Sequence, residues 1–137
     1  MSGPALLKKH SHAAIHEVAI NEAVELLDLL AACLERKEPE KAWKVALVLV
    51  EHWETRTLRH VEAEEEGLYK KLVEDHPELK DEVTALIRDH QLMRKTVAKI
   101  KNMLREQHVS KEMFRAFAAL VEIDLLHNEA EEALLME

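Results

Sequence analysis

The stretch LRHVEAEEEGLY, residues 58–69, places His60 and Glu64 one helical turn apart on a face that otherwise carries apolar residues. A second stretch near the end of the chain, LLHNEAEEALL at residues 125–135, repeats this arrangement with His127 and Glu131. One such pair is an ordinary feature of helices. Two pairs, each followed by a leucine eight positions after the histidine, predict two amphipathic helices whose inner faces contribute to a shared polar layer.

Helix breakers divide the chain into four predicted helices. Pro39 and Pro77 disfavour helix at the residue before them and fit the first turn of the next helix, and Ser110 suits an N-cap. The predicted helices span about residues 4–36, 40–74 and 78–106, and the fourth runs from near Ser110 almost to the end. We expect the second helix, which contains residues 58–69, to be uninterrupted.

The composition supports an all-α fold. Apolar residues make up 47% of the 137 residues and charged residues 34%, with only 2 glycines and 3 prolines, which is typical of helical bundles. Each predicted helix carries one apolar seam, and the short connections make successive helices antiparallel neighbours. We therefore predict a single domain, residues 1–137, folded as an up-down-up-down antiparallel four-helix bundle.

The net charge and the short apolar runs of the chain argue against several classes of partner. The net charge of -8 disfavours binding to nucleic acid or to an anionic membrane surface. The apolar runs are far shorter than a membrane-spanning helix needs, and the first residues lack the apolar segment of a signal peptide. We expect a cytoplasmic protein with no nucleic-acid and no membrane partner.

Four histidines, one from each predicted helix, are expected at the same level of the bundle. Residues equidistant from a turn lie level with each other in antiparallel helices. His16 and His60 are equidistant from the turn expected between the first two helices, as are His90 and His127 from the turn between the last two. Two carboxylates lie one turn away on the same side. The converging residues are therefore His16, His60, His90, His127, Glu64 and Glu131.

These six groups indicate a bound cation, because a buried charge without a partner is costly. Imidazole and carboxylate ligands suit iron, zinc or manganese. Six ligands are too many for one tetrahedral zinc, but they suit two metals that share bridging carboxylates. His12 faces the same layer one turn before His16. The spacing leaves open whether His12 or His16 is the ligand from the first helix, or whether His12 is an additional or outer ligand.

In this order, His16, HVEAE at residues 60–64, RDH ending at His90 and HNEAE at residues 127–131 resemble the hemerythrin-like, or HHE cation-binding, domains. The resemblance covers essentially the whole chain. It implies a centre of two iron ions, for which zinc or manganese could substitute. The implied terminal ligands are the four histidines of the layer, and the implied bridging ligands are Glu64 and Glu131. Ferritin-like di-iron bundles differ, because they use Glu-x-x-His at i, i+3.

The third predicted helix departs from the oxygen-carrying hemerythrins. Those proteins have a second histidine four positions after the one in this helix, where this chain has Arg94. The sequence therefore resembles the branch with four histidines and two carboxylates, which includes nitric-oxide-responsive iron-centre repair proteins and iron-sensing domains. A missing terminal ligand implies a more open iron site and argues against simple oxygen storage.

The resemblance implies a non-haem di-iron protein that binds a small diatomic ligand or oxidant, such as dioxygen, nitric oxide or peroxide, for sensing, storage or iron handling. One alternative is a redox enzyme of the di-iron peroxidase or nitric oxide reductase type, or a protein that repairs iron–sulfur centres. Such an enzyme would need an external electron donor, because the single Cys33 provides no internal dithiol. A third alternative is a structural or interaction bundle that holds metal adventitiously.

Further predictions concern the neighbours of the layer. We expect Arg94 and Asp124 to form an ion pair beneath it, which either orients a histidine N–H or a bound ligand or serves only as a salt bridge at the edge of the seam. Glu65 and Glu66 are expected on an exposed face. Tyr69 is expected to pack in the core, with contact to the rim of the site as the alternative.

Overall fold

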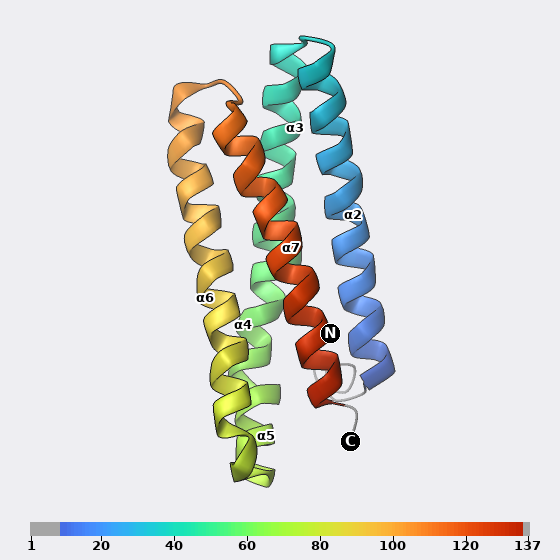
Figure 1. Cartoon of the computed structure of the whole chain (residues 1–137), viewed down its shortest axis with the longest axis vertical. Helices are drawn as coiled ribbons and strands as arrows, with labels where there is room; N and C mark the ends of the chain where they lie inside the picture. Colours follow the sequence, from blue (N-terminus) through green and yellow to red (C-terminus); the bar gives the residue numbers. More distant parts are fainter. Residues whose placement is uncertain (1–8, 136–137) are drawn as a thin grey trace.

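Four antiparallel helical arms form the molecule in the computed structural model, which describes residues 9–135 (Figure 1). The described residues contain no strand, so the predicted all-α bundle is confirmed. The predicted start of the first helix, near residue 4, lies outside the described residues. The elements in chain order are α2 (Lys9–Glu35), α3 (Pro39–His52), η1 (Trp53–Leu58), α4 (Arg59–Glu66), α5 (Leu68–Asp75), η2 (Pro77–Leu79), α6 (Lys80–Met103), η3 (Leu104–Glu106) and α7 (Lys111–Leu134).

The second arm is not the uninterrupted α-helix that we expected. One π-helical segment, Trp53–Leu58, separates α3 from α4, and Gly67 separates α4 from α5. A π-segment adds a residue to the local turn and occurs frequently at functional sites. Here it buries the side chain of Thr57, which occupies a seam position one turn after Trp53. The break at Gly67 lets two consecutive residues, Leu68 and Tyr69, both lie in the interior.

The helix starts agree with the breakers in the sequence. Pro39 lies in the first turn of α3, where its missing N–H has no helical partner to lose. Pro77 likewise begins η2, a 3₁₀ turn that leads into α6. Ser110 is the N-cap of α7, since its Oγ accepts a hydrogen bond of 3.0 Å from the Met113 N–H. The predicted N-cap is therefore confirmed.

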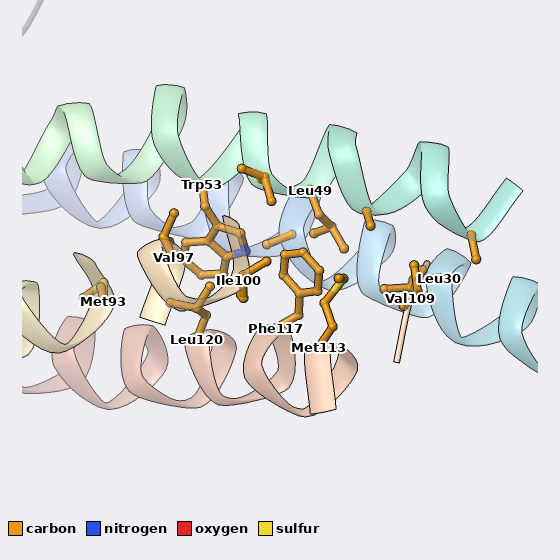
Figure 2. Packing of buried hydrophobic residues seen from close by; sticks show 14 of the residues in the cluster. Leu30, Leu49, Trp53, Met93, Val97, Ile100, Val109, Met113, Phe117 and Leu120 are labelled. Atoms are coloured by element: carbon orange, nitrogen blue, oxygen red, sulfur yellow. The ribbon is translucent and has the colours of Figure 1, made fainter. Parts of the chain in front are cut away.

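Two apolar clusters lie along the bundle, with a polar layer between them. The larger cluster fills the half of the bundle near the α2–α3 and α6–α7 connections, and Figure 2 shows Trp53, Phe117 and Leu120 packed within it. The smaller cluster, at the other end, is built on Leu68, Tyr69, Val83 and Leu86. The polar layer thus has apolar packing on both sides. None of the described helices is long and apolar enough to cross a membrane.

Candidate metal centre

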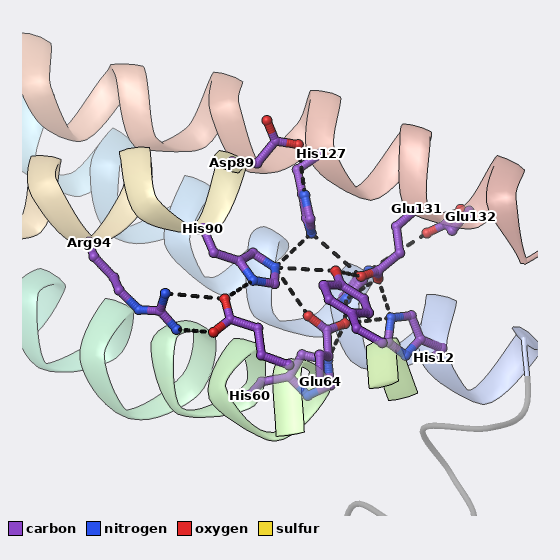
Figure 3. Close-up of polar contacts among 12 residues, drawn as sticks. His12, His60, Glu64, Asp89, His90, Arg94, His127, Glu131 and Glu132 are labelled. Atoms are coloured by element: carbon purple, nitrogen blue, oxygen red, sulfur yellow. Dashed lines mark hydrogen bonds and ion pairs between the residues drawn. The ribbon is translucent and has the colours of Figure 1, made fainter. Parts of the chain in front are cut away.

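Seven polar side chains from all four arms converge in this layer (Figure 3). Both carboxylates, Glu64 and Glu131, are completely buried. Five imidazoles surround them, and all five turn Nε2 towards a carboxylate oxygen. Four of these histidines are buried, and the His60 side chain is 13% exposed. The five histidines are His12 and His16 from α2, His60 from α4, His90 from α6 and His127 from α7.

The first group of donors surrounds one oxygen of Glu64. Oε2 of Glu64 lies 2.7 Å from Nε2 of His12, 3.2 Å from that of His60 and 3.4 Å from that of His16. His12 Nε2 also contacts Oε1 of Glu131. Three imidazoles and one carboxylate therefore form a compact pocket of ligand atoms.

The second group uses the other oxygen of Glu64. Oε1 of Glu64 lies 3.3 Å from Nε2 of His90, and Oε2 of Glu131 lies 3.5 Å from Nε2 of His127. The two imidazole Nε2 atoms are 3.1 Å apart. Glu64 belongs to both groups, and Glu131 also approaches the first group, 3.3 Å from Nε2 of His16. Both carboxylates are therefore placed between two clusters of nitrogen donors.

The donor atoms fit bound cations. Both oxygens of Glu64 and Nε2 of His60 are buried without a hydrogen-bond partner of good geometry among the described residues, although buried polar atoms are normally paired. Two ligand atoms each about 2.1 Å from one ion, at right angles to each other, are about 3.0 Å apart. The nitrogen–nitrogen distance between His90 and His127 is close to this value. Mixed imidazole and carboxylate donors suit iron, zinc and manganese.

Two outer carboxylates determine the tautomers of the second pair of histidines. Nδ1 of His90 donates to Glu65 Oε2 over 2.7 Å, and Nδ1 of His127 donates to Asp89 Oδ2 over 2.9 Å. Because an ionised carboxylate only accepts hydrogen bonds, each Nδ1 carries the proton and each Nε2 keeps a lone pair for a cation. When both rings are neutral, as binding of a cation requires, these lone pairs point towards each other, and a shared cation would satisfy them.

Arg94 pairs with Glu65 and not with Asp124, so the predicted Arg94–Asp124 pair is wrong. Its guanidinium donates two hydrogen bonds of 3.1 Å to the two oxygens of Glu65, and its side chain is 37% exposed. This position keeps the guanidinium partly in water, whereas Asp124 is buried and only 4% exposed. The prediction that Glu65 lies on an exposed face is also wrong, because Glu65 links Arg94 to His90.

Tyr69 reaches the centre, which was the alternative to the favoured expectation that it packs in the core. Its hydroxyl donates to Oε2 of Glu131 and lies 3.3 Å from Nε2 of His90. Its ring stacks on the imidazole of His90, with ring centroids 5.4 Å apart. Burial and the negative charges of Glu64 and Glu131 raise the pKa of Tyr69 far above its ordinary value. Tyr69 is therefore a neutral hydrogen-bond donor to a carboxylate of the layer.

The carboxylates hold protons on two histidines when no metal is present. Burial lowers the pKa of His12, but the hydrogen bond to Glu131 and the close negative charges of Glu131 and Glu64 outweigh burial and raise it to about 9. Burial is likewise outweighed at His127, where Glu131 and Asp89 raise the pKa to about 9. Burial raises the pKa of Glu64 and Glu131, but the surrounding histidines hold both below the usual range. A metal ion would therefore displace protons from this layer.

The structure brings together all six residues that the sequence placed in one layer, together with His12, whose part in the layer the sequence left open. His12 and His16 both approach the carboxylates, so the fifth imidazole comes from α2 and not from the third predicted helix. Sequence reasoning missed the roles of Glu65, Asp89 and Tyr69. The only signal for Asp89 was its place directly before His90. Glu65 and Tyr69 could not be placed without knowing the helix crossings and the break at Gly67.

Comparison with known proteins gives one match. The model of a family described as Hemerythrin HHE cation binding domain matches residues 21–137. The matched region contains His60, Glu64, His90, His127 and Glu131, and it begins after His12 and His16. Comparisons with curated proteins and with solved structures found no match.

Proposed function

Because the chain belongs to the family of hemerythrin HHE cation-binding domains, we propose that it is a non-haem di-iron protein that binds a small diatomic ligand or oxidant. The observation that carries this proposal is the pair of donor groups that share Glu64. One ion would be held by three histidines and the other by two, with both carboxylates between them. When bound, iron supplies redox chemistry and a coordination position for dioxygen, nitric oxide or peroxide.

The inequality of the two groups supports a site for an exogenous ligand. His12, His16 and His60 crowd the first group, whereas only His90 and His127 serve the second. The second group would therefore supply fewer protein donors to an ion, which favours an added small ligand there. Its two histidines are also fixed by Glu65 and Asp89, an arrangement that orients a ligand ring and raises its basicity. Sensing, storage and iron handling are all compatible with such a site.

The alternative functions predict different behaviour of the same centre. A peroxidase, a nitric oxide reductase or a protein that repairs iron–sulfur centres would turn over with an external electron donor. A structural bundle with adventitious zinc or manganese would bind metal without responding to these ligands. The proposal also includes the cytoplasmic location expected from the sequence, which cell fractionation would test.

The test is a ligand titration of iron-loaded protein under anaerobic conditions. Dioxygen, nitric oxide and hydrogen peroxide would be added separately, and the absorbance and magnetic spectra of the iron would be followed. Reversible spectral change at about one ligand per two irons supports a binding protein. Continuous consumption of peroxide or nitric oxide with a supplied reductant supports an enzyme. No spectral response to any of the three ligands would contradict the proposal.

A further inference from the structure

A groove between α2 and α3 opens on the outside of the bundle, where these two helices lie side by side (Figure 1). It has a volume of about 480 Å³, and Leu26, Leu29 and Val48 form its apolar wall. Leu29 and Val48 are each 48% exposed. The two helices carry five of the seven exposed large apolar side chains among the described residues: Val18, Val24, Leu29, Leu47 and Val48. Apolar side chains that gather around an exposed groove commonly mark a site of interaction.

The surface around this groove has a regular helical spacing. The α2–α3 face, as defined here, consists of six exposed residues: Glu25, Leu29 and Arg36 in the first arm, and Lys44, Val48 and Glu51 in the second. Residues three, four or seven positions apart share one side of a helix. Arg36 continues the last turn of α2, because its N–H donates to the carbonyl of Ala32. The face therefore runs along two neighbouring helices, with apolar residues at its centre.

The two ends of the α2–α3 face carry opposite charges. Because the two helices are antiparallel, Glu25 and Glu51 lie at the same end, towards the metal layer. Arg36 and Lys44 lie at the other end, near the connection between α2 and α3. An acidic end, an apolar centre and a basic end therefore follow one another along the face.

The charges next to each end are balanced within the chain. At the acidic end, the guanidinium of Arg56 lies 3.6 Å from Oε2 of Glu22. At the basic end, Nζ of Lys41 lies 3.2 Å from Oε2 of Glu38. The four charged residues of the α2–α3 face therefore determine the sign of charge that each end presents to a partner.

We propose that the α2–α3 face is the contact surface of a homodimer, in which a second copy of the chain packs on it in the antiparallel direction. A two-fold axis that crosses both helices near Leu29 and Val48 places each apolar centre on its counterpart. The same rotation brings the acidic end of one copy to the basic end of the other, so one surface supplies both signs of charge. A parallel arrangement would instead oppose like charges at both ends.

A second copy fits this face better than a partner of a single charge sign. A uniformly basic or uniformly acidic partner would be attracted to one end of the face and repelled by the other. The six residues are fewer than the roughly 20–30 per partner of a standard interface. We therefore expect a reversible, concentration-dependent dimer. Its formation is independent of the metal centre and of the function proposed for that centre.

Sedimentation velocity of the purified chain, from micromolar to millimolar concentration, tests the dimer. Leu29→Ser and Val48→Ser remove apolar contacts at the centre of the face, and Leu126→Ser, at an exposed position of α7, is the matched control. Two-fold symmetry makes each substitution act twice, so we expect the dissociation constant to rise about tenfold in both centre variants and to stay unchanged in the control. Because all three positions are exposed, the melting temperature of the dilute variants should equal that of the parent.

An exchange of charges tests the antiparallel arrangement. Glu51→Lys leaves α3 with a basic residue at both ends of the face, and Lys44→Glu leaves it with an acidic residue at both ends. Each single variant should therefore dimerise about tenfold more weakly than the parent. The double variant, Glu51→Lys with Lys44→Glu, restores opposite charges across the two-fold axis and should recover most of the affinity. An equimolar mixture of the two single variants should associate for the same reason.

Three results would overturn the proposed dimer. The first is a chain that stays monomeric over the whole concentration range, which would leave the face to a different partner. The second is a dimer that Leu126→Ser weakens as much as Leu29→Ser does. The third is a double charge variant that associates no more tightly than the two single variants. Absence of iron from the parent would contradict the proposed function alone, because this association requires no metal.

Discussion

The histidines that face the metal layer depend on residues behind them. Glu65 and Asp89 accept hydrogen bonds from Nδ1 of His90 and His127, and Arg94 holds Glu65 in place with a bidentate pair. Among the described residues, no carboxylate pairs comparably with Nδ1 of the three histidines of the first group, and Glu132 lies 4.0 Å from Nδ1 of His16. The two proposed iron positions should therefore differ in affinity.

Neutralising the outer carboxylates should weaken one of the two iron positions. Substitution Asp89→Asn or Glu65→Gln removes the charge that fixes the histidine tautomer, and changes of this kind typically cost 10- to 100-fold in metal affinity. Competition with an iron chelator would measure the loss. Glu66→Gln, an exposed neighbour, is the control. Equal affinity of both iron positions in the parent and in the Asp89→Asn and Glu65→Gln variants would show that these carboxylates do not tune the centre.

Removing the Tyr69 hydroxyl should destabilise the metal-free protein. Tyr69→Phe leaves a buried oxygen of Glu131 without its donor, at a cost of about 1–3 kcal/mol, while the stacked ring remains. Denaturant unfolding of parent and variant without metal would give the difference. Iron content should be retained, because the histidines are untouched. A variant as stable as the parent would mean that this hydroxyl contributes nothing to the layer.

At the scale of single residues, sequence reasoning succeeds where a side chain lies on its own helix seam. The helical period of 3.6 residues alone places Glu64, His90 and Glu131 in the interior. It fails for contacts made between helices at the edge of a seam. Arg94 on α6 pairs with Glu65 on α4 rather than with Asp124 on α7, and only the helix crossing decides between the two.

The helices begin at the residues that local sequence signals predict, but the second arm has irregular turns in its middle that no local signal predicts. The N-cap at Ser110 and the prolines at the helix starts are found as expected. The π-segment and the break at Gly67 have no comparable signal, because an irregular turn persists only when packing against other helices favours it. These irregularities bury Thr57 and bring Tyr69 to the metal layer.

Loss of the α7 cap should lower stability without affecting the centre. Ser110→Ala removes the acceptor for the Met113 N–H and should cost about 1 kcal/mol. Ser110→Thr, which keeps a hydroxyl, should lie close to the parent. Thermal unfolding measures the first effect and iron per chain the second. Because the cap is at the opposite end of α7 from His127 and Glu131, loss of iron in Ser110→Ala would contradict the assignment of the site.

For the whole molecule, the polar layer makes the metal-free fold sensitive to pH. The pKa values of His12 and His127 are raised from 6.5 to about 9 in the folded state. A raised pKa contributes stability that is fully present below about pH 6.5 and is lost as pH rises through about 9. The free energy of unfolding of the metal-free protein should therefore fall between pH 6.5 and pH 9.5.

Iron should reverse this dependence, because each metal ion competes with protons for the same nitrogen atoms. Iron affinity should rise over the interval in which the stability of the metal-free form falls. Denaturant unfolding of metal-free protein at several pH values, with chelator competition for the iron-loaded form, tests both trends. His108→Ala, an exposed histidine, should leave both profiles unchanged. A free energy of unfolding of the metal-free protein that rises towards pH 9.5 would contradict the protonation of His12 and His127.

The most direct measurement of the di-iron centre is iron per chain in protein produced with added iron. The parent is compared with the double variant His60→Ala, Glu131→Ala, and with a control that removes the exposed pair His76 and Glu78, whose side chains are 53% and 71% exposed. We predict two irons in the parent and in the control, and a large loss in the double variant at the metal layer. A parent without iron, or a double variant that retains two irons, would contradict the di-iron centre.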